Sequence, residues 1–228
     1  MPHDRMDNSG PRRHALFAAL GLVLIGPVAA AIQASSDSST EAPASQPARR
    51  SVTGRVTAKG GAALPDVVVY LESTDRNRRF DVPEPVAVSQ KDAQFAPSLV
   101  VVCVGQSVDF VNDEERPIEH NVFSQSPAKP FDLGLYPPGQ TKSVTFDKAG
   151  PVRLHCSIHR YMDAVVYVCP TPFHAKVAAD GSYSIDNVPL GEYVLKTWQR
   201  TQRFRDKSAN VTVSDGQTAT LDLELSRY

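Results

Sequence analysis

Hydrophobic and polar positions alternate in two separated stretches of the chain, at 52–71 and 183–225. An alternation with a period of two is typical of half-buried β-strands. The first stretch ends in the β-branched run at 67–71. The second is accompanied by three turn pairs, Asp180-Gly181, Leu190-Gly191 and Asp215-Gly216. The pattern predicts an all-β fold class, with consecutive antiparallel strands in the second stretch.

Composition supports the same fold class. Only 7% of the 228 residues are aromatic, but there are 18 Pro and 13 Gly, which favours short strands joined by turns over long helices. The length fits one or two domains. A balance of 24 Lys and Arg against 25 Asp and Glu, without a basic stripe, gives no electrostatic support for binding nucleic acid.

The amino terminus is predicted to be an export segment. Residues 15–32 carry no charge and follow Arg12 and Arg13, so residues 1–34 are interpreted as a signal peptide or a retained membrane anchor. Both alternatives place the remaining chain in the periplasm or another extracytoplasmic compartment. Residues 35–50 are rich in Ser, Pro and Ala without periodicity, which predicts a disordered linker.

The two alternating stretches also contain sequence motifs that resemble those of a known domain family. V-T-G-R-V, L-P-D-V-V-V-Y-L-E and D-G-S-Y-S-I-D-N-V-P-L-G-E-Y-V-L resemble the transthyretin-like, carboxypeptidase-regulatory sandwich, a carbohydrate-binding-like fold. The resemblance covers 51–73 and 171–228, with about 97 residues between the two parts. We expect a domain inserted at a loop of this sandwich, because exposed loops tolerate insertions. The alternative is a leading hairpin followed by a separate trailing domain.

A cluster of metal-ligating residue types lies in the middle segment. The sequence L-H-C-S-I-H-R-Y-M places Cys156, His159 and Met162 on one short loop, and His120 in E-H-N-V-F-S supplies another imidazole. One thiolate, two imidazoles and a weak axial thioether are the ligands of a trigonal copper site. Zinc is the alternative metal, since one Cys and two His also bind it. The Met favours copper, because thioethers select soft metals.

The order of these residues resembles the cupredoxins, the type I blue copper proteins, and the short loop is most similar to amicyanin. The resemblance covers 83–169 and implies a Greek-key sandwich that binds one copper ion through His120, Cys156, His159 and Met162. It also implies that Asn121 ties the two ligand loops together and donates a backbone hydrogen bond to the Cys156 sulfur. Arg160 and Tyr161 depart from the family, which usually has Pro and Phe there.

The remaining cysteines are Cys103 and Cys169. In a cupredoxin the strands that carry them are neighbours, so the resemblance makes a disulfide between them a candidate feature in an oxidising compartment.

The resemblance implies an electron carrier, not an enzyme, with unidentified redox proteins as donor and acceptor. The chain resembles the cupredoxin-like proteins called methylamine utilisation proteins. The sequence has six His, and only His155 and His174 remain outside the export segment and the blue site, too few for a catalytic copper centre. The alternative function is a copper- or carbohydrate/envelope-binding module in which the sandwich acts. An aromatic platform of Trp198, Tyr193 and Tyr183 would serve it, although their alternation favours the core.

Overall fold

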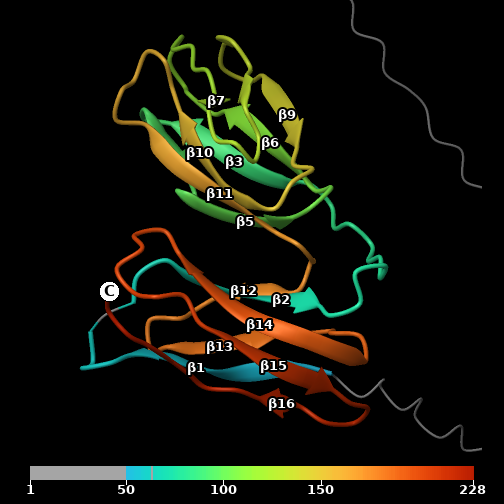
Figure 1. Cartoon of the computed structure of the whole chain (residues 1–228). Coiled ribbons are helices and arrows are strands. Elements are labelled where there is room, and N and C mark those ends of the chain that lie inside the picture. Colours follow the sequence, from blue (N-terminus) through green and yellow to red (C-terminus); the bar gives the residue numbers. More distant parts are fainter. Residues whose placement is uncertain (1–49, 63) are drawn as a thin grey trace, which may run out of the picture. The chain divides into compact units, whose positions relative to one another are not determined.

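A computed structural model describes residues 50–62 and 64–228, and every regular element in this part of the chain is a β-strand (Figure 1). The all-β fold class is therefore confirmed. The expected export segment at 1–34 and nearly all of the expected linker at 35–50 lie outside the described residues. Among the described residues, the structure has no helix with the length and apolarity needed to cross a membrane.

Strands from the two alternating stretches, with one short strand just before the second stretch, form two sheets, which we call the terminal sandwich. Its strands are β1 (Val52–Ala58), β2 (Val67–Ser73), β12 (His174–Lys176), β13 (Ser182–Ile185), β14 (Gly191–Gln199), β15 (Ser208–Val213), β16 (Ala219–Thr220) and β17 (Leu223–Leu225). One sheet has the order β13-β1-β16, with β17 also paired to β1, and the other has the order β12-β2-β14-β15. Apolar side chains from both sheets share one buried core.

Pairing within the terminal sandwich differs in part from the prediction of consecutive antiparallel strands. Strand β14 does pair with β15, but β13 pairs with β1 and lies in the other sheet. Strand β16 runs parallel to β1. The period-two pattern fixes which side chains face inward but not which strand is the neighbour, so either arrangement satisfies it.

Strands that precede and follow the middle segment share these sheets. Val52 of β1 is the register partner of Ile185, and Val68 of β2 is the partner of Trp198. Gly54 is required where β1 passes its partners, because a Cβ there would lie 2.0 Å from the Leu221 carbonyl oxygen. The assignment of 51–73 plus 171–228 to one domain family stays a prediction.

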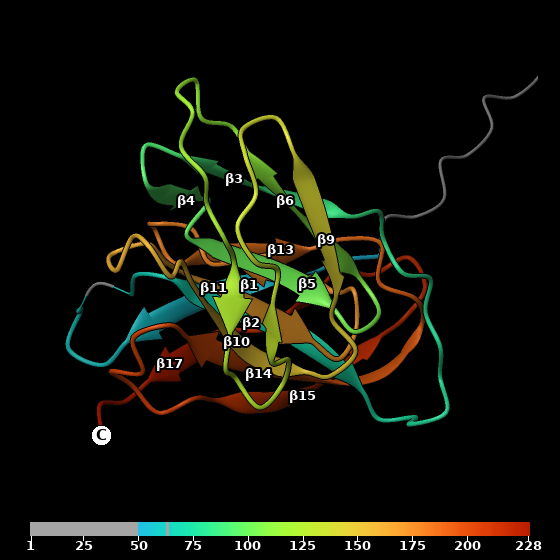
Figure 2. The ribbon, with the colours of Figure 1, turned by 90° about the horizontal axis from the view of Figure 1, so that it is seen from above.

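The middle segment forms two further sheets, which we call the central sandwich. Its strands are β3 (Val86–Lys91), β4 (Gln94–Ala96), β5 (Leu99–Cys103), β6 (Ser107–Asn112), β7 (Phe123–Ser124), β8 (Phe131–Asp132), β9 (Thr141–Thr145), β10 (Gly150–His155) and β11 (Asp163–Cys169). The sheet orders are β5-β11-β10-β7-β8 and β4-β3-β6-β9. Figure 2 shows β3, β4, β6 and β9 from a second direction.

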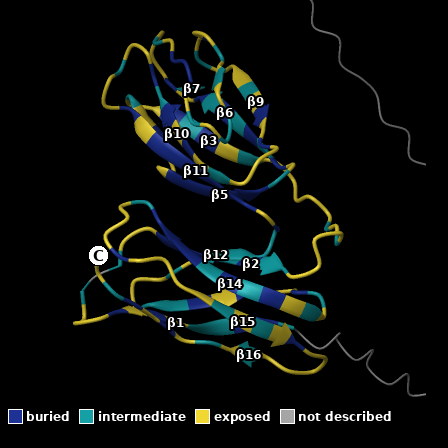
Figure 3. Cartoon of the chain, in the orientation of Figure 1, coloured by how far each residue is buried: buried dark blue, intermediate teal, exposed yellow. Residues whose placement is uncertain are grey.

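Strands β5 and β11 are buried on both faces (Figure 3). Val100 and Val166 face the core of the central sandwich, whereas Val101 and Tyr167 belong to a second cluster that includes Val68 and Trp198 of the terminal sandwich. Burial on both faces explains why these strands are nearly continuous apolar runs. One face of these strands therefore packs in the core of the central sandwich, and the other face packs against the terminal sandwich.

Candidate metal centre

Two loops of the central sandwich carry the four predicted ligands. His120 forms an isolated antiparallel bridge with Tyr136 just before β7. Cys156, His159 and Met162 lie in the short loop that leaves β10 and enters β11. His120, Cys156 and Met162 are buried, and His159 is half-buried. The His120 loop is thus fixed by backbone pairing, and the second loop is fixed by the strands at both of its ends.

The structure brings His120, Cys156 and His159 together. The Nδ1 atoms of the two imidazoles lie 3.1 Å apart, and Sγ of Cys156 lies 4.0 Å from Nδ1 of His120 and 3.8 Å from Nδ1 of His159. In the plane of these three atoms, the point equidistant from them lies about 2.1 Å from each. Metal–nitrogen and metal–sulfur bonds measure about 2.0–2.3 Å. The size of the triangle and its donor set therefore fit a metal ion.

Met162 is the fourth predicted ligand. Its backbone N–H donates to the His159 carbonyl oxygen at 2.9 Å, which closes the loop. Its side chain is 1% exposed and belongs to the same buried cluster as Cys156 and Tyr136. The thioether is therefore enclosed with the thiol in the core of the central sandwich, and its role as axial ligand stays a prediction.

Glu114 is a member of the site that the sequence did not reveal. Its Oε1 lies 2.8 Å from Nε2 of His120, and both side chains are almost fully buried. Burial disfavours the charged carboxylate, but hydrogen bonds from His120 and from the Ala93 backbone N–H outweigh it and hold the pKa of Glu114 below its usual value. An imidazole that donates through Nε2 keeps the Nδ1 lone pair toward the centre. Glu114 thus selects the tautomer of His120 that can bind a metal.

Asn121 joins the two ligand loops through its side chain. The Ser157 backbone N–H donates to Oδ1 of Asn121 at 2.7 Å, while Nδ2 donates to Asp132 at 3.1 Å. Its carbonyl oxygen accepts from the Gln90 side chain. The backbone hydrogen bond expected from Asn121 to the Cys156 sulfur is not among those made by residues 50–62 and 64–228. The connection between the loops is therefore carried by the amide side chain.

The surface of the ligand loop is exposed and mixed in character. Ile158 is 50% exposed and Tyr161 is 76% exposed, and Arg160 between them is exposed. His155 lies outside the triangle, with its Nδ1 4.0 Å from Oδ1 of Asp163. The two departures from the family pattern thus lie on the solvent side of the site.

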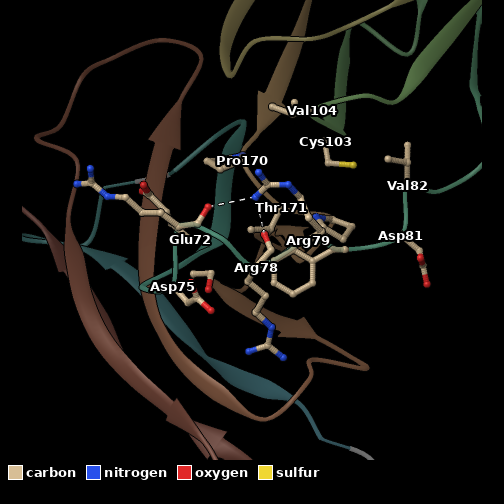
Figure 4. A pocket seen from close by; sticks show the side chains of 14 residues that line it. Glu72, Asp75, Arg78, Arg79, Asp81, Val82, Cys103, Val104, Pro170 and Thr171 are labelled. Carbon is tan, nitrogen blue, oxygen red and sulfur yellow. Dashed lines mark hydrogen bonds between the residues drawn. The ribbon is translucent and has the colours of Figure 1, made fainter.

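Cys103 and Cys169 are direct register partners on the parallel strands β5 and β11, so the expected neighbourhood of these strands is confirmed. Both are buried with free thiols, and burial raises the pKa of each. Neighbouring strands lie about 4.8 Å apart, within the Cα range of a disulfide. Cys103 also borders a cavity of about 480 Å³ beside Arg79 and Val82 (Figure 4). Oxidation of the pair stays a prediction.

The three rings of the alternative aromatic platform are buried. Tyr183 and Tyr193 lie in the core of the terminal sandwich, and Trp198 stacks on Tyr167 with ring centroids 4.2 Å apart. The interpretation of these residues as core is confirmed. The rings therefore do not form an exposed surface for a carbohydrate.

Comparison with family models and with curated proteins finds no match to this chain. Among solved structures, a Cu-containing nitrite reductase from Thermus scotoductus is 27% identical, with a TM-score of 0.36, and the match covers 43% of this chain and 25% of that one. A purple cupredoxin from Nitrosopumilus maritimus is 20% identical over 37% of this chain and 99% of that one, with a TM-score of 0.33. Amicyanin from Paracoccus versutus is 23% identical over 44% and 98%, with a TM-score of 0.35.

Proposed function

We propose that this protein is an exported type I copper protein that carries single electrons between redox partners. The observation that carries the proposal is the triangle of one sulfur and two nitrogen atoms from Cys156, His120 and His159. Copper in such a site supplies a one-electron couple. The cupredoxin resemblance of residues 83–169 supports the same function. The name of the methylamine utilisation proteins that the chain resembles suggests a link to that process.

Copper fits this donor set better than zinc. A thiol and a thioether enclosed in one apolar cluster, Cys156 and Met162, form a soft environment that selects copper. Glu114 holds one imidazole and Asn121 holds the ligand loop, so the ligand atoms are kept close together by the protein itself. A site held in this way needs little rearrangement when the charge of its metal changes.

The ligand loop also offers a contact surface for redox proteins. His159 is the half-buried ligand, and the exposed Ile158, Arg160 and Tyr161 flank it. An electron would therefore enter and leave through the His159 edge. Arg160 would favour donors and acceptors with carboxylates near an apolar patch, since complementary charge increases association rates. The terminal sandwich would serve as a docking module on the export side of the membrane.

Adding Cu(II) to the metal-free protein tests this proposal. The expected result is an intense blue thiolate-to-copper absorption band, a small hyperfine splitting in the electron paramagnetic resonance spectrum and reversible one-electron voltammetry. A colourless protein, or an ordinary tetragonal cupric signal, would overturn the proposal. Zinc added first and then challenged with copper measures which metal the site prefers.

A further inference from the structure

Arg200 links the terminal sandwich to the metal-binding loop. It follows the last residue of β14, and its Nη2 donates to Oδ2 of Asp163 at 2.6 Å. Its Nη1 lies 3.2 Å from the Ser98 carbonyl oxygen and 3.1 Å from the Ser98 hydroxyl. The Arg200 side chain is only 20% exposed. One guanidinium thus binds the starts of two neighbouring strands of the other sandwich.

The residues around Arg200 hold it in place. The Gln199 side chain donates to the Phe204 carbonyl oxygen at 3.0 Å and accepts from the Phe204 backbone N–H at 3.2 Å. These two bonds brace the turn that begins at Arg200. On the other side, Trp198 stacks on Tyr167 of β11. The guanidinium is therefore presented by a fixed turn next to a packed interface.

Asp163, the residue that Arg200 binds, lies at the base of the ligand loop. It follows Met162 directly, and it is the register partner of His155, which precedes Cys156. The carbonyl of Ser98 accepts from both Arg200 and the Val165 backbone N–H. The contacts of Arg200 therefore fix the point where the chain leaves the last predicted ligand and enters β11.

We propose that Arg200 is a positioning residue for the metal centre and that the terminal sandwich is thereby a working part of that centre. This inference rests on the proposed function. A planar guanidinium binds a carboxylate and a carbonyl oxygen at the same time, which one ammonium on a flexible stem does less well. We call these paired contacts of the Arg200 guanidinium the fork. The fork holds Asp163, and Asp163 fixes the backbone that carries Met162. Without the fork, the Met162 end of the loop moves more freely.

Three variants of the full chain test the role of Arg200. Arg200→Met removes the fork and the charge, Arg200→Lys keeps the charge without the fork, and Arg203→Met removes a charge from an exposed position on the same turn. We measure the rate at which copper passes to a chelator, the reduction potential and the spin-resonance spectrum. Trp198 is the only Trp in the chain, so its emission reports whether the interface stays packed.

Arg200→Met is expected to release copper about three- to tenfold faster than the wild type, because it loses a charge-assisted hydrogen bond that is partly shielded from solvent. Its reduction potential should shift more than that of Arg203→Met, and Arg200→Lys should also release copper faster than the wild type. Equal rates and potentials for Arg200→Met and Arg203→Met would overturn the inference. So would wild-type behaviour of Arg200→Lys, because charge alone would then account for the effect.

Failure of the proposed function gives a different result. A wild-type protein that never turns blue with copper refutes the carrier function itself. Hydrogen exchange of the metal-free protein then gives an independent view of the loop. Faster exchange at 162–165 in Arg200→Met than in Arg203→Met is the expected effect of losing the fork, and equal exchange in the two variants contradicts it.

Discussion

Nδ1 of His120 lies 3.1 Å from Nδ1 of His159. Two imidazole nitrogens at this distance repel each other through their lone pairs unless a proton or a cation lies between them. The Glu114 carboxylate next to Nε2 of His120 keeps that Nδ1 available as an acceptor. The two nitrogens therefore share a proton or hold a metal ion between them, and the folded chain presents both at the spacing that a metal ion needs.

Copper should accordingly stabilise the fold. A ligand that binds only the folded state adds about 2.7 kcal/mol to the free energy of unfolding at 100 times its dissociation constant. For a protein of this size, the melting temperature should rise by roughly 5–10 °C. Thermal unfolding followed by circular dichroism, with and without copper, measures the change. Identical melting temperatures would contradict the metal site, and His120→Ala should remove most of the rise.

Cys156→Ser should abolish the blue band, because the band requires a thiolate bound to copper. The hydroxyl can still contribute a weak oxygen ligand, so ordinary cupric copper should remain detectable. Cys103→Ser is the matched control, since Cys103 is also buried but lies outside the triangle. Visible spectra of the two variants separate the roles of the two thiols. An intense band retained in Cys156→Ser would show that the ligand assignment is wrong.

Met162→Gln should keep copper and lower the reduction potential. An amide oxygen is a harder donor than a thioether and stabilises the oxidised ion. Met162→Leu should shift the potential in the opposite direction, since it removes the donor and keeps the side chain apolar. Voltammetry of both variants gives the two signs. Equal shifts in the same direction would mean that Met162 acts through packing in the core and not as a ligand.

Asn121→Ala should loosen the ligand loop. The Ser157 backbone N–H loses its acceptor, and breaking a hydrogen bond of this kind costs about 1–3 kcal/mol of stability. Ser157→Ala is a sharp control, because the backbone donor stays in place. Urea unfolding of the two variants measures the difference. Equal free energies of unfolding for Asn121→Ala and the wild type would show that the amide does not tie the loops.

The sequence was sufficient to predict those site residues whose type and spacing are typical of metal ligands. Cys156, His159 and Met162 share one loop, and the triangle with His120 follows from a pattern of strands and ligand types. Glu114 was not predictable, because its contact with His120 depends on how the intervening loop turns back. Arg200 was not predictable either, since its contacts cross between two sandwiches.

Strand positions were predictable for a similar reason, and strand pairing was not. Alternation at 183–225 gave the strands, but the neighbour of β13 proved to be β1 and not β14. A period-two pattern specifies which face of a strand is buried, and several partners can satisfy it.

His174 should make the stability of the terminal sandwich depend on pH. Burial in β12, with a smaller contribution from Lys176, lowers the pKa of His174 to about 4. The unfolded chain has a His pKa of about 6.5 and so binds more protons between these two values. Stability from this residue is fully present above about pH 6.5 and is lost as the pH falls toward 4.

The expected loss reaches about 3 kcal/mol by pH 4, from the difference between the folded and unfolded pKa values. The amide introduced by His174→Gln does not titrate in this window, and all other titrating groups are the same in both proteins, so the difference in unfolding free energy between them isolates the contribution of His174. Urea unfolding at several pH values between 7.5 and about 4 measures that difference. It should change steadily below pH 6.5, because protons taken up by His174 on unfolding favour the unfolded wild type. A difference that does not vary with pH would mean that His174 stays as accessible to protons in the folded chain as in the unfolded one.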